Sequence, residues 1–238
     1  MIKIEEISKS FKDSKVLNKI SFEINKGDFA AVMGPSGSGK STLLYSISAM
    51  DRISEGSVIF EGVNLTLLEE SELSKFRLNK MGFVFQNAQM LKNLSIYDNI
   101  ILPGLIAKNE PAKKIRKRAT ELMERMGITG MEDRDIKEVS GGQLQRASIC
   151  RAMINNPEIL FLDEPTGALN SEATEQVLQI LEELNKDGMT IMIVTHDQRV
   201  AARAKKVLYI RDGRVAACKN FKIGDNRVAE LDRWLKSL

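Results

Sequence analysis

The stretch "GPSGSGKST", Gly34 to Thr42, holds three glycines, three serines, a proline and a lysine, and no large apolar side chain. Such a stretch cannot fill a hydrophobic core. Its first eight residues fit G-x-x-x-x-G-K-[ST], the pattern of a phosphate-binding loop. The apolar strand "FAAVM" (29–33) precedes it and the helical pattern "STLLYSISAM" (41–50) follows it. This strand–loop–helix context favours a phosphate loop over a chance glycine-rich turn.

The chemistry of the loop follows from its residue types. Glycines let the backbone turn sharply and aim several N–H groups inward, and the start of the next helix adds partial positive charge. We expect Lys40 to reach the β- and γ-phosphates and the Ser41 hydroxyl to bind Mg²⁺. The residues expected to contact nucleotide are Gly34, Pro35, Ser36, Gly37, Ser38, Gly39, Lys40, Ser41 and Thr42.

The composition limits the class of protein. The 238 residues, 43% of them hydrophobic, suit one large α/β domain or two small ones. Lys plus Arg is 35 and Asp plus Glu is 32, a balance that argues against nucleic acid as the partner. We expect no signal peptide in the acidic start "MIKIEEISKSF" and no membrane span anywhere. Cys150 and Cys218 lack metal-site spacing, and we expect reduced thiols with Cys150 in the core.

Strands alternate with helices along the chain, which predicts a parallel sheet with right-handed crossovers. Residues 95–127 turn helical and read as an insertion between strands. Within them, "KNEPAKKIRKRATELMERMG" (108–127) is best interpreted as a solvated helix face. The predicted strands are 2–7, 16–24, 29–33, 56–62, 81–86, 158–164 and 189–196, and the other predicted helices are 41–50, 141–155 and 171–187.

Polar residues end three of the predicted strands. Asp163 and Glu164 close "FLDE", where we expect Asp163 to hold Mg²⁺ through water and Glu164 to polarise an attacking water. His196 follows "MTIMIVT" and is interpreted as a γ-phosphate sensor, although a lone histidine is more often structural. Gln86 ends "MGFVFQ", and its amide can touch both Mg²⁺ and the water. With the phosphate loop, four strand ends converge on one site suited to phosphoryl transfer.

The stretch "VSGGQLQR" (139–146) completes a set of motifs that resembles the ATP-binding subunits of ABC transporters over residues 1–220. Residues 34–41 resemble the Walker A motif, Gln86 the Q-loop, "VSGGQ" the signature, "ILFLDE" the Walker B motif, "ALNS" (168–171) the D-loop and His196 the switch histidine. Phe11 matches the aromatic residue that stacks on adenine. Several weak motifs in the family's order are together specific.

The resemblance implies a fold and an assembly. The fold is an α/β P-loop NTPase (RecA-like): a mostly parallel sheet core, an N-terminal antiparallel β subdomain and a helical insertion subdomain at about 88–155. The cofactors implied are ATP and Mg²⁺. The assembly is a head-to-tail homodimer. In it, the start of the helix that carries the signature is a second anion-binding site, and it faces the nucleotide bound by the partner. Its residues here are Ser140, Gly141, Gly142 and Gln143.

Two positions depart from the family's pattern. Val139 replaces the usual leucine of the signature, a small apolar change that should leave the site active. Asn170 replaces the usual aspartate of the D-loop and loses its charge, which puts coupling between the two sites of a dimer in doubt.

The closest branch by resemblance serves lipoprotein release, macrolide export and antimicrobial-peptide (bacitracin-type) resistance, with "GALNS" most like the last. It implies a peripheral subunit on the cytoplasmic face of a membrane, beneath an integral membrane permease. The candidate contact is 87–104, "NAQMLKNLSIYDNIILPG", as a stretch, because core packing explains some of its apolar residues. These residues are Met90, Leu91, Leu94, Ile96 and Tyr97. Alternatives are a soluble ABC ATPase acting on DNA or ribosomes, a lipoprotein or cell-division type, and an unrelated P-loop NTPase such as a kinase.

The end of the chain, 221–238, is predicted as an amphipathic extension. Its apolar residues Val228, Leu231, Leu235 and Leu238 have helical spacing. Packing on the domain's own surface is the ordinary interpretation, and contact with a dimer or membrane partner is the alternative.

Overall fold

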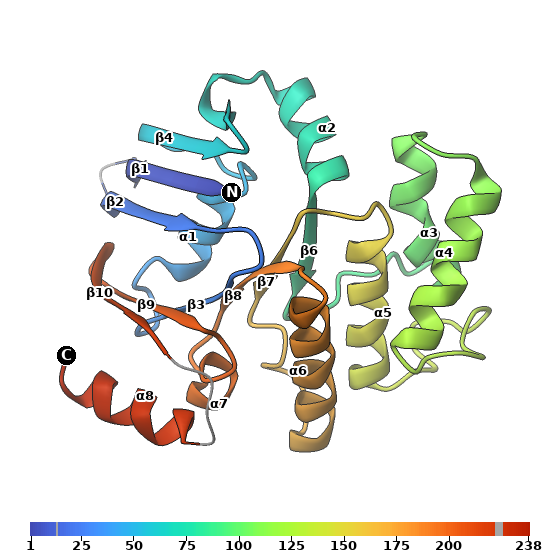
Figure 1. Ribbon diagram of the computed structural model, residues 1–238. Helices are drawn as coiled ribbons and strands as arrows, with labels where there is room; N and C mark the ends of the chain where they lie inside the picture. The colour runs from blue at the N-terminus through green and yellow to red at the C-terminus, as the bar shows by residue number, and fades with distance from the viewer. Residues whose placement is uncertain (13, 222–225) are drawn as a thin grey trace. The chain divides into compact units, whose positions relative to one another are not determined.

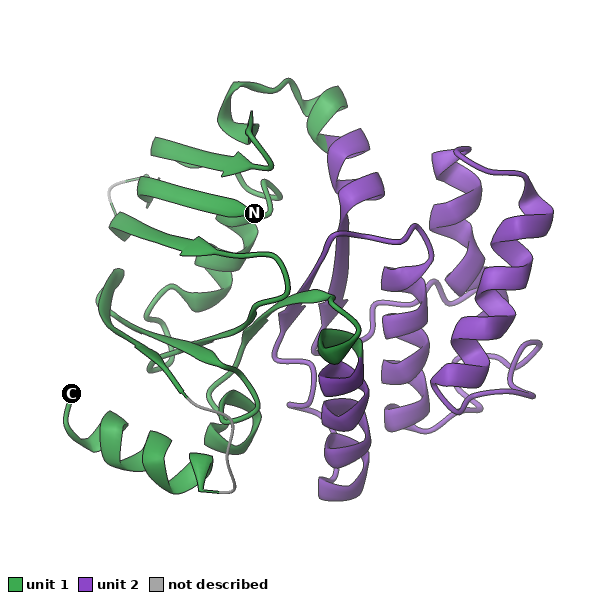
Figure 2. Cartoon of the chain, in the orientation of Figure 1, with its two compact units in different colours: residues 1–73, 184–238 green, residues 74–183 purple. Residues whose placement is uncertain are grey.

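The structure is a computed structural model that describes residues 1–12, 14–221 and 226–238. The chain forms two compact units, residues 1–73 with 184–238 (the first unit) and residues 74–183 (the second unit), shown in Figure 2. The chain passes between them within helix α2 (Glu70–Lys80) and within helix α6 (Ser171–Lys186). The predicted insertion at 88–155 falls inside the second unit, and its boundaries stay a prediction.

The first unit holds an antiparallel sheet and a mostly parallel group of strands (Figure 1). The antiparallel sheet has the order β2-β1-β4-β5, with β1 (Ile2–Phe11), β2 (Ser14–Ile24), β4 (Glu55–Phe60) and β5 (Val63–Asn64). The second group has the order β10-β9-β3-β8, with β3 (Phe29–Met33), β8 (Thr190–Val194), β9 (Lys206–Arg211) and β10 (Arg214–Asn220). Only β10 in this group runs antiparallel to its neighbour.

Helices of the first unit follow these strands. They are α1 (Lys40–Ile47), the short 3₁₀ helix η1 (Leu65–Leu67), α7 (Gln198–Ala201) and α8 (Arg227–Lys236). All five residues of β3 and of β8 are buried. Parallel strands covered on both faces are apolar throughout, which explains why these runs do not alternate with polar residues.

The second unit pairs two parallel strands, and helix α5 packs on one of them, β6. The strands are β6 (Met81–Phe85) and β7 (Ile159–Asp163), and the helices are α3 (Ile96–Ala107), α4 (Ala112–Arg125) and α5 (Gly141–Met153). In Figure 1, α3 and α4 lie side by side, and α3 also packs on α5. The interpretation of 108–127 as a solvated helix face is confirmed for α4. This helix exposes most of its charged side chains and buries only Ile115, Ala119, Leu122 and Met123.

The C-terminal helix α8 packs on its own unit, as the ordinary interpretation held. Leu231 is 1% exposed, and the Trp234 ring meets Phe221 edge to face with centroids 5.8 Å apart. The Arg227 guanidinium donates to the carbonyls of Ala202 and Arg203, each at 3.1 Å. The predicted apolar stripe is wrong at Val228 and Leu238, which are 45% and 37% exposed, because the face turned inward is centred on Leu231. Residues 222–225 of the predicted extension lie outside the described residues.

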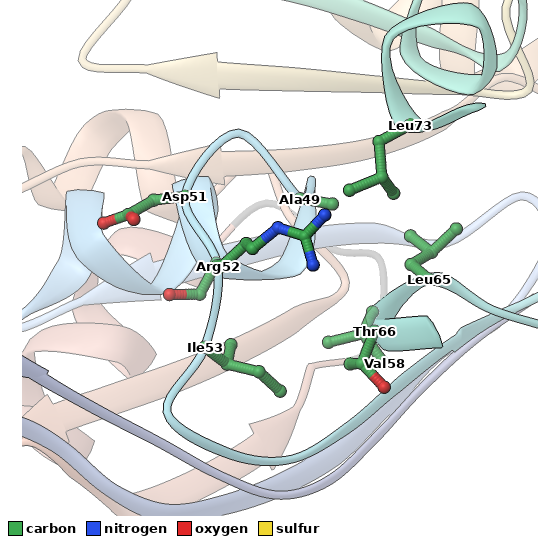
Figure 3. A pocket seen from close by; sticks show the side chains of 9 residues that line it. Ala49, Asp51, Arg52, Ile53, Val58, Leu65, Thr66 and Leu73 are labelled. Carbon is green, nitrogen blue, oxygen red and sulfur yellow. The ribbon is translucent and has the colours of Figure 1, made fainter. Parts of the chain in front are cut away.

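A small cavity in the first unit opens beside the end of α1 (Figure 3). Its volume is about 70 Å³, and the Arg52 side chain extends across it toward Leu65. A water molecule needs about 10–15 Å³ of such space, so the cavity has room for a few waters and not for a nucleotide. Its lining residues are Ser46, Ala49, Asp51, Arg52, Ile53, Val58, Leu65, Thr66 and Leu73. The phosphate loop 34–42 contributes none of them.

The helices of the described residues include none that is both long and apolar enough to cross a membrane.

The two cysteines should differ sharply in reactivity. Cys150 is 0% exposed and burial raises the pKa of its thiol to about 12, whereas Cys218 is exposed. Because the thiolate is the reactive form, a maleimide at pH 8 should label only Cys218 in the folded chain and both thiols in guanidinium. Mass spectrometry counts the labels. A Cys218→Ser variant should take no label while folded, and labelling of that variant would contradict the buried position of Cys150.

Candidate functional site

The phosphate loop connects β3 to α1 in the first unit. Gly39 is the N-cap of α1 and has φ 99°, a left-handed conformation that glycine adopts without a steric penalty. Gly39 offers no side chain to cap the helix, so the first-turn N–H groups of α1 receive no cap from this residue. An N-terminus of this kind favours a bound anion.

The Lys40 side chain folds back over the same loop. Its ammonium donates to the carbonyls of Gly34 at 3.0 Å and Pro35 at 2.8 Å, which holds a positive charge above the loop. Ser38, inside the loop, is 6% exposed, and its hydroxyl has no hydrogen-bond partner among the residues that the structure describes. Buried hydroxyls usually have a partner. The loop therefore combines a cation with donors that suit phosphate oxygens.

His196 and the phosphate loop follow the carboxyl ends of two parallel strands, β8 and β3. Val32 of β3 pairs with Val194 of β8 in parallel, and the Thr195 N–H donates to the Val32 carbonyl at 3.1 Å. Gly34 and His196 each follow their strand by one or two residues, so the structure brings these two predicted positions together. His196 is exposed.

The turn that carries His196 is held on both sides. The Asp197 N–H donates to the Thr195 hydroxyl at 3.0 Å, and the Asp197 carboxylate caps α7 by accepting from the Arg199 N–H at 2.7 Å. Burial raises the pKa of Asp197, but the hydrogen bonds and charge of Arg199 outweigh burial, and the net pKa is lowered. The carboxylate is thus kept ionised as a helix cap beside His196.

Phe11 ends β1, and its ring is 48% exposed with the Lys9 ammonium 4.7 Å from the ring centroid. The next strand, β2, passes close to the phosphate loop: a side chain on Gly39 would lie 3.1 Å from the Val16 carbonyl and 2.9 Å from Leu17. The β1–β2 hairpin thus approaches the start of α1, and the adenine contact of Phe11 stays a prediction.

In the second unit, Gln86, Asp163 and Glu164 lie at one edge of the β6–β7 pair. Phe85 pairs with Asp163, so Gln86 and Glu164 follow adjacent strand ends. The Gln86 amide packs against Gly167, where a side chain would meet Gln86 Nε2 at 2.8 Å. Glu164 has φ 47° and its carbonyl accepts from the Gly167 N–H at 3.1 Å. This left-handed conformation is uncommon for a residue with a side chain, and the hydrogen bond to Gly167 holds it in place.

The predicted signature is the start of α5. Ser140 and Gln143 form a capping box: the Gln143 N–H donates to the Ser140 hydroxyl at 3.2 Å, and the Ser140 N–H donates to Gln143 Oε1 at 2.8 Å. The box leaves the Gly141 and Gly142 N–H groups as the other donors of the first turn. The helix start is therefore a fixed pair of amide donors.

The signature and the predicted D-loop pack against each other, a contact that the sequence analysis missed. A side chain on Gly142 would meet the Ala173 side chain at 2.8 Å, so glycine permits the close approach of α5 to the start of α6. Asn170 caps α6, with its Oδ1 accepting from the Ala173 N–H at 2.8 Å. The amide of asparagine does this as an aspartate would, so the substitution preserves the cap. The only sequence signal was Asn170 itself, a good N-cap residue three positions before Ala173.

The predicted residues thus fall into two groups. The phosphate loop, Phe11 and His196 belong to the first unit, and Gln86, Asp163, Glu164 and the signature belong to the second. Within each unit the predicted neighbours do come together. The convergence of all four strand ends on one phosphate involves both units and stays a prediction.

Comparison with known proteins identifies the family. The ABC transporter family model matches residues 17–167. The whole chain is 42% identical over 242 aligned positions to the macrolide export ATP-binding/permease protein MacB of Campylobacter fetus and covers 37% of that relative. It is 41% identical over 217 positions to the ABC transporter ATP-binding protein YxdL of Bacillus subtilis, which covers 90% of this chain and 84% of that relative.

Solved structures that are similar to this chain belong to the same family. A dimeric bacterial ABC transporter cassette has a TM-score of 0.87 and 36% identity over 94% of this chain and all of that one. A dimeric cassette in a post-hydrolysis state with ADP and Pi has a TM-score of 0.86 and 35% identity over the same shares. The chain belongs to the ABC transporter family and is an ATPase domain of that family. The predicted P-loop NTPase fold class is confirmed. The chain spans 37% of the length of the MacB relative.

The roles of Lys40 and Glu164 can be separated by substitution. Lys40→Ala removes a charge that would pair with phosphate and should weaken ATP binding by about tenfold or more. Glu164→Gln should preserve ATP binding and lower turnover at least about a hundredfold, because an amide cannot accept the proton of the attacking water. Nucleotide titration and steady-state hydrolysis measure the two effects. Lys26→Ala, in an exposed turn, is the matched control for lost positive charge. Normal turnover in Glu164→Gln would show that another group is the base.

Proposed function

We propose that this chain is the ATP-hydrolysing subunit of a transporter that works beneath an integral membrane permease, on the cytoplasmic face of the membrane. ATP binding closes a head-to-tail homodimer and hydrolysis reopens it. The cycle drives the export or removal of antimicrobial peptides or similar amphipathic compounds. The names of the relatives support an export role, since MacB is described as a macrolide export ATP-binding/permease protein.

The observation that carries the proposal is the presence of two different anion-binding helix starts in one chain. The start of α1 carries Lys40 and lies in the first unit, whereas the start of α5 is capped by Ser140 and Gln143 and lies in the second. One nucleotide needs one phosphate loop. A second set of amide donors on a separate unit is suited to a nucleotide bound by another copy. The dimeric arrangement of the similar cassettes supports this assignment.

The reaction follows from the residues at the strand ends. Lys40 and the first-turn N–H groups of α1 bind and orient the phosphates. Glu164, fixed by its turn to Gly167, accepts a proton from the attacking water, and His196 donates to the γ-phosphate from its held turn. Ser41, Gln86 and Asp163 offer hydroxyl, amide and carboxylate oxygens, a donor set that fits Mg²⁺. The metal would neutralise charge on the phosphates.

Fewer side chains of the proposed permease contact, residues 87–104, are accessible than the sequence suggested. Met90 is 9% exposed and Ile96 is 1% exposed, so both belong to the core of the second unit, and the expectation that Met90 is an accessible contact is wrong. Leu91 is 51% exposed and is followed by the exposed Lys92 and Asn93. An exposed leucine at the tip of the segment that follows Gln86 is the apolar group available to a short helix of the permease.

ATP should convert the Glu164→Gln variant from monomer to dimer. With ATP and Mg²⁺ the variant should elute at about twice the monomer mass, and with ADP it should stay a monomer, because only the γ-phosphate reaches the second helix start. Size-exclusion chromatography with light scattering measures the mass.

The signature variant needs its own control, because Ser140 also caps α5. Ser140→Ala removes only the cap, at a cost of about 1 kcal/mol of stability, and should still dimerise. Ser140→Arg adds bulk and should prevent the dimer. Retention of the ATP dimer in Glu164→Gln/Ser140→Arg would rule out the head-to-tail arrangement.

Leu91→Glu should separate ATP binding from transport. Because Leu91 is half exposed, the variant should melt at the wild-type temperature and bind ATP normally. It should fail to co-purify with the permease, and cells that carry it should be as sensitive to amphipathic peptide antibiotics as cells without the gene.

The matched control is Ile106→Glu, on α3, where the side chain is 57% exposed. It should co-purify normally. Co-purification of Leu91→Glu would move the contact elsewhere. A deletion strain with unchanged sensitivity to a panel of peptide antibiotics would remove the proposed cargo and leave the coupling intact.

A further inference from the structure

The helix that begins with the signature also holds the segment that follows Gln86. Arg151, near the end of α5, donates from one guanidinium nitrogen to the Gln89 carbonyl at 2.8 Å and from the other to the Ala88 carbonyl at 2.7 Å. Gln145, earlier on the same helix, is 2% exposed, and its side chain donates to the Phe85 carbonyl at 3.0 Å. Both side chains bond to residues at least 60 positions earlier in the chain, and α5 is thus fastened to β6 and to the loop after it.

The segment itself has an unusual and fixed conformation. Gln89 has φ 47°, a left-handed conformation that costs free energy for a residue with a side chain. Such a conformation persists where its surroundings over-determine it. Here the carbonyl of Gln89 is gripped by Arg151 on one side, and the next side chain, Met90, is buried on the other. The fork of Arg151 therefore holds a strained turn in place.

Asn99, on α3, also holds the loop that follows Gln86 by hydrogen bonds to its backbone. This residue is 1% exposed, and its Oδ1 accepts from the Leu91 N–H at 2.7 Å. Its amide nitrogen contacts three carbonyls, those of Leu91, Leu94 and Ser95, at 3.1, 3.2 and 2.9 Å. The result is a loop whose backbone is bound at several points, from Ala88 to Ser95, while the Leu91 side chain is half exposed to solvent. A loop built this way moves as a body rather than residue by residue.

We propose that Arg151 is a positioning residue that locks the segment 88–91 to the signature helix, so that a displacement of the signature is delivered to Leu91. The inference rests on the proposed function, because it takes the signature as the group that meets a partner's nucleotide and Leu91 as the contact with the permease. It adds the physical link between them. That link is a single rigid helix with the signature at one end and a two-point grip on the contact segment near the other.

Arginine suits this role for a physical reason. Its planar guanidinium presents two donors in a fixed fork, which matches two successive carbonyls. Lysine has one ammonium on a flexible stem and can satisfy one carbonyl well but cannot fix both in one orientation. A loss of positioning should therefore appear in Arg151→Lys as well as in Arg151→Met, and should be smaller in the lysine variant.

The test measures hydrogen exchange of the Leu91 amide in the full chain without nucleotide. The wild-type amide is bonded to Asn99 and should exchange slowly. Arg151→Met should speed its exchange about tenfold or more, since two hydrogen bonds from a charged group are lost, and Arg151→Lys should lie between. Arg116→Met, an exposed arginine on α4, is the matched control and should leave the Leu91 amide unchanged. Amides of α4 report whether the unit as a whole stays folded.

Two further readouts distinguish positioning from simple stability. In Arg151→Met the affinity for ATP should stay at the wild-type value, because the phosphate loop is in the other unit, while stimulation of hydrolysis by the permease should fall at least about tenfold. Arg151→Lys should restore part of that stimulation. If the methionine variant does not fold, the lysine variant carries both measurements.

Two results would overturn the proposal. One is wild-type exchange at Leu91 in Arg151→Met and Arg151→Lys, which would show that the fork does not hold the segment. The other is faster exchange with full stimulation by the permease, which would show that the lock does not transmit anything. A failure of the proposed function looks different: the wild-type chain would then neither bind the permease nor be stimulated by it, whatever its exchange at Leu91, and the transmitting role of Arg151 would fall with it.

Discussion

The first turn of α1 begins at a glycine that cannot cap it, and much of the first unit depends on that constraint. Gly39 takes a left-handed conformation because the chain must turn from β3 into α1 with its N–H groups facing the loop. A side chain there would also strike Val16 and Leu17 of β2. The antiparallel sheet therefore approaches the helix start closely only because the cap residue has no side chain. The same absence leaves the helix start to an anion rather than to the protein's own oxygen.

In the second unit, the start of α5 is capped by side chains, unlike the start of α1. There the Ser140 hydroxyl and the Gln143 side chain satisfy two backbone donors within the chain, so α5 is stable without a ligand. The glycines that follow serve packing and exposure together: Gly142 allows α6 to approach, and Gly141 is exposed. The start of α1 has no side-chain cap, and we propose that nucleotide completes it, whereas the start of α5 is capped within the chain. That difference fits a chain in which nucleotide first binds at α1 and is then recognised at a rigid α5.

Sequence patterns predicted the buried strands and the motifs because both are local. All-apolar runs such as "FAAVM" have few alternatives to a covered parallel strand, and a phosphate loop is defined by the spacing of its own residues. Predictions that depended on which face of a segment turns inward were less secure. Met90 and Leu91 are adjacent and both apolar, so the sequence pattern could not tell that Met90 is buried and Leu91 exposed. The conformation that separates them is fixed by hydrogen bonds from Asn99 and Arg151, which lie on other helices.

Other elements left weaker signals. Most residues of helix α2 are polar, and Leu73 is its one buried residue. The sequence of α2 therefore lacks the apolar stripe from which a helix could be predicted. Strands β9 and β10 close the parallel group of the first unit with an antiparallel hairpin, and β10 alternates between half-buried and exposed residues. On α8, the packing of Trp234 on Phe221 set the inward face, and that contact joins residues that periodicity within the helix cannot relate.

Two loops that follow strands of the second unit each contain a non-glycine residue in a left-handed conformation. Glu164 follows β7 and Gln89 lies shortly after β6, and both have φ 47° although neither is glycine. Each is held by a hydrogen bond to its own carbonyl, from the Gly167 N–H in one case and from Arg151 in the other. The first bond is local and closes the tight turn from Glu164 to Gly167. The second comes from a distant helix, so the conformation of the loop after Gln86 depends on where α5 lies. A strained turn that is stabilised from outside its own loop is the kind of element whose shape another part of the protein can change.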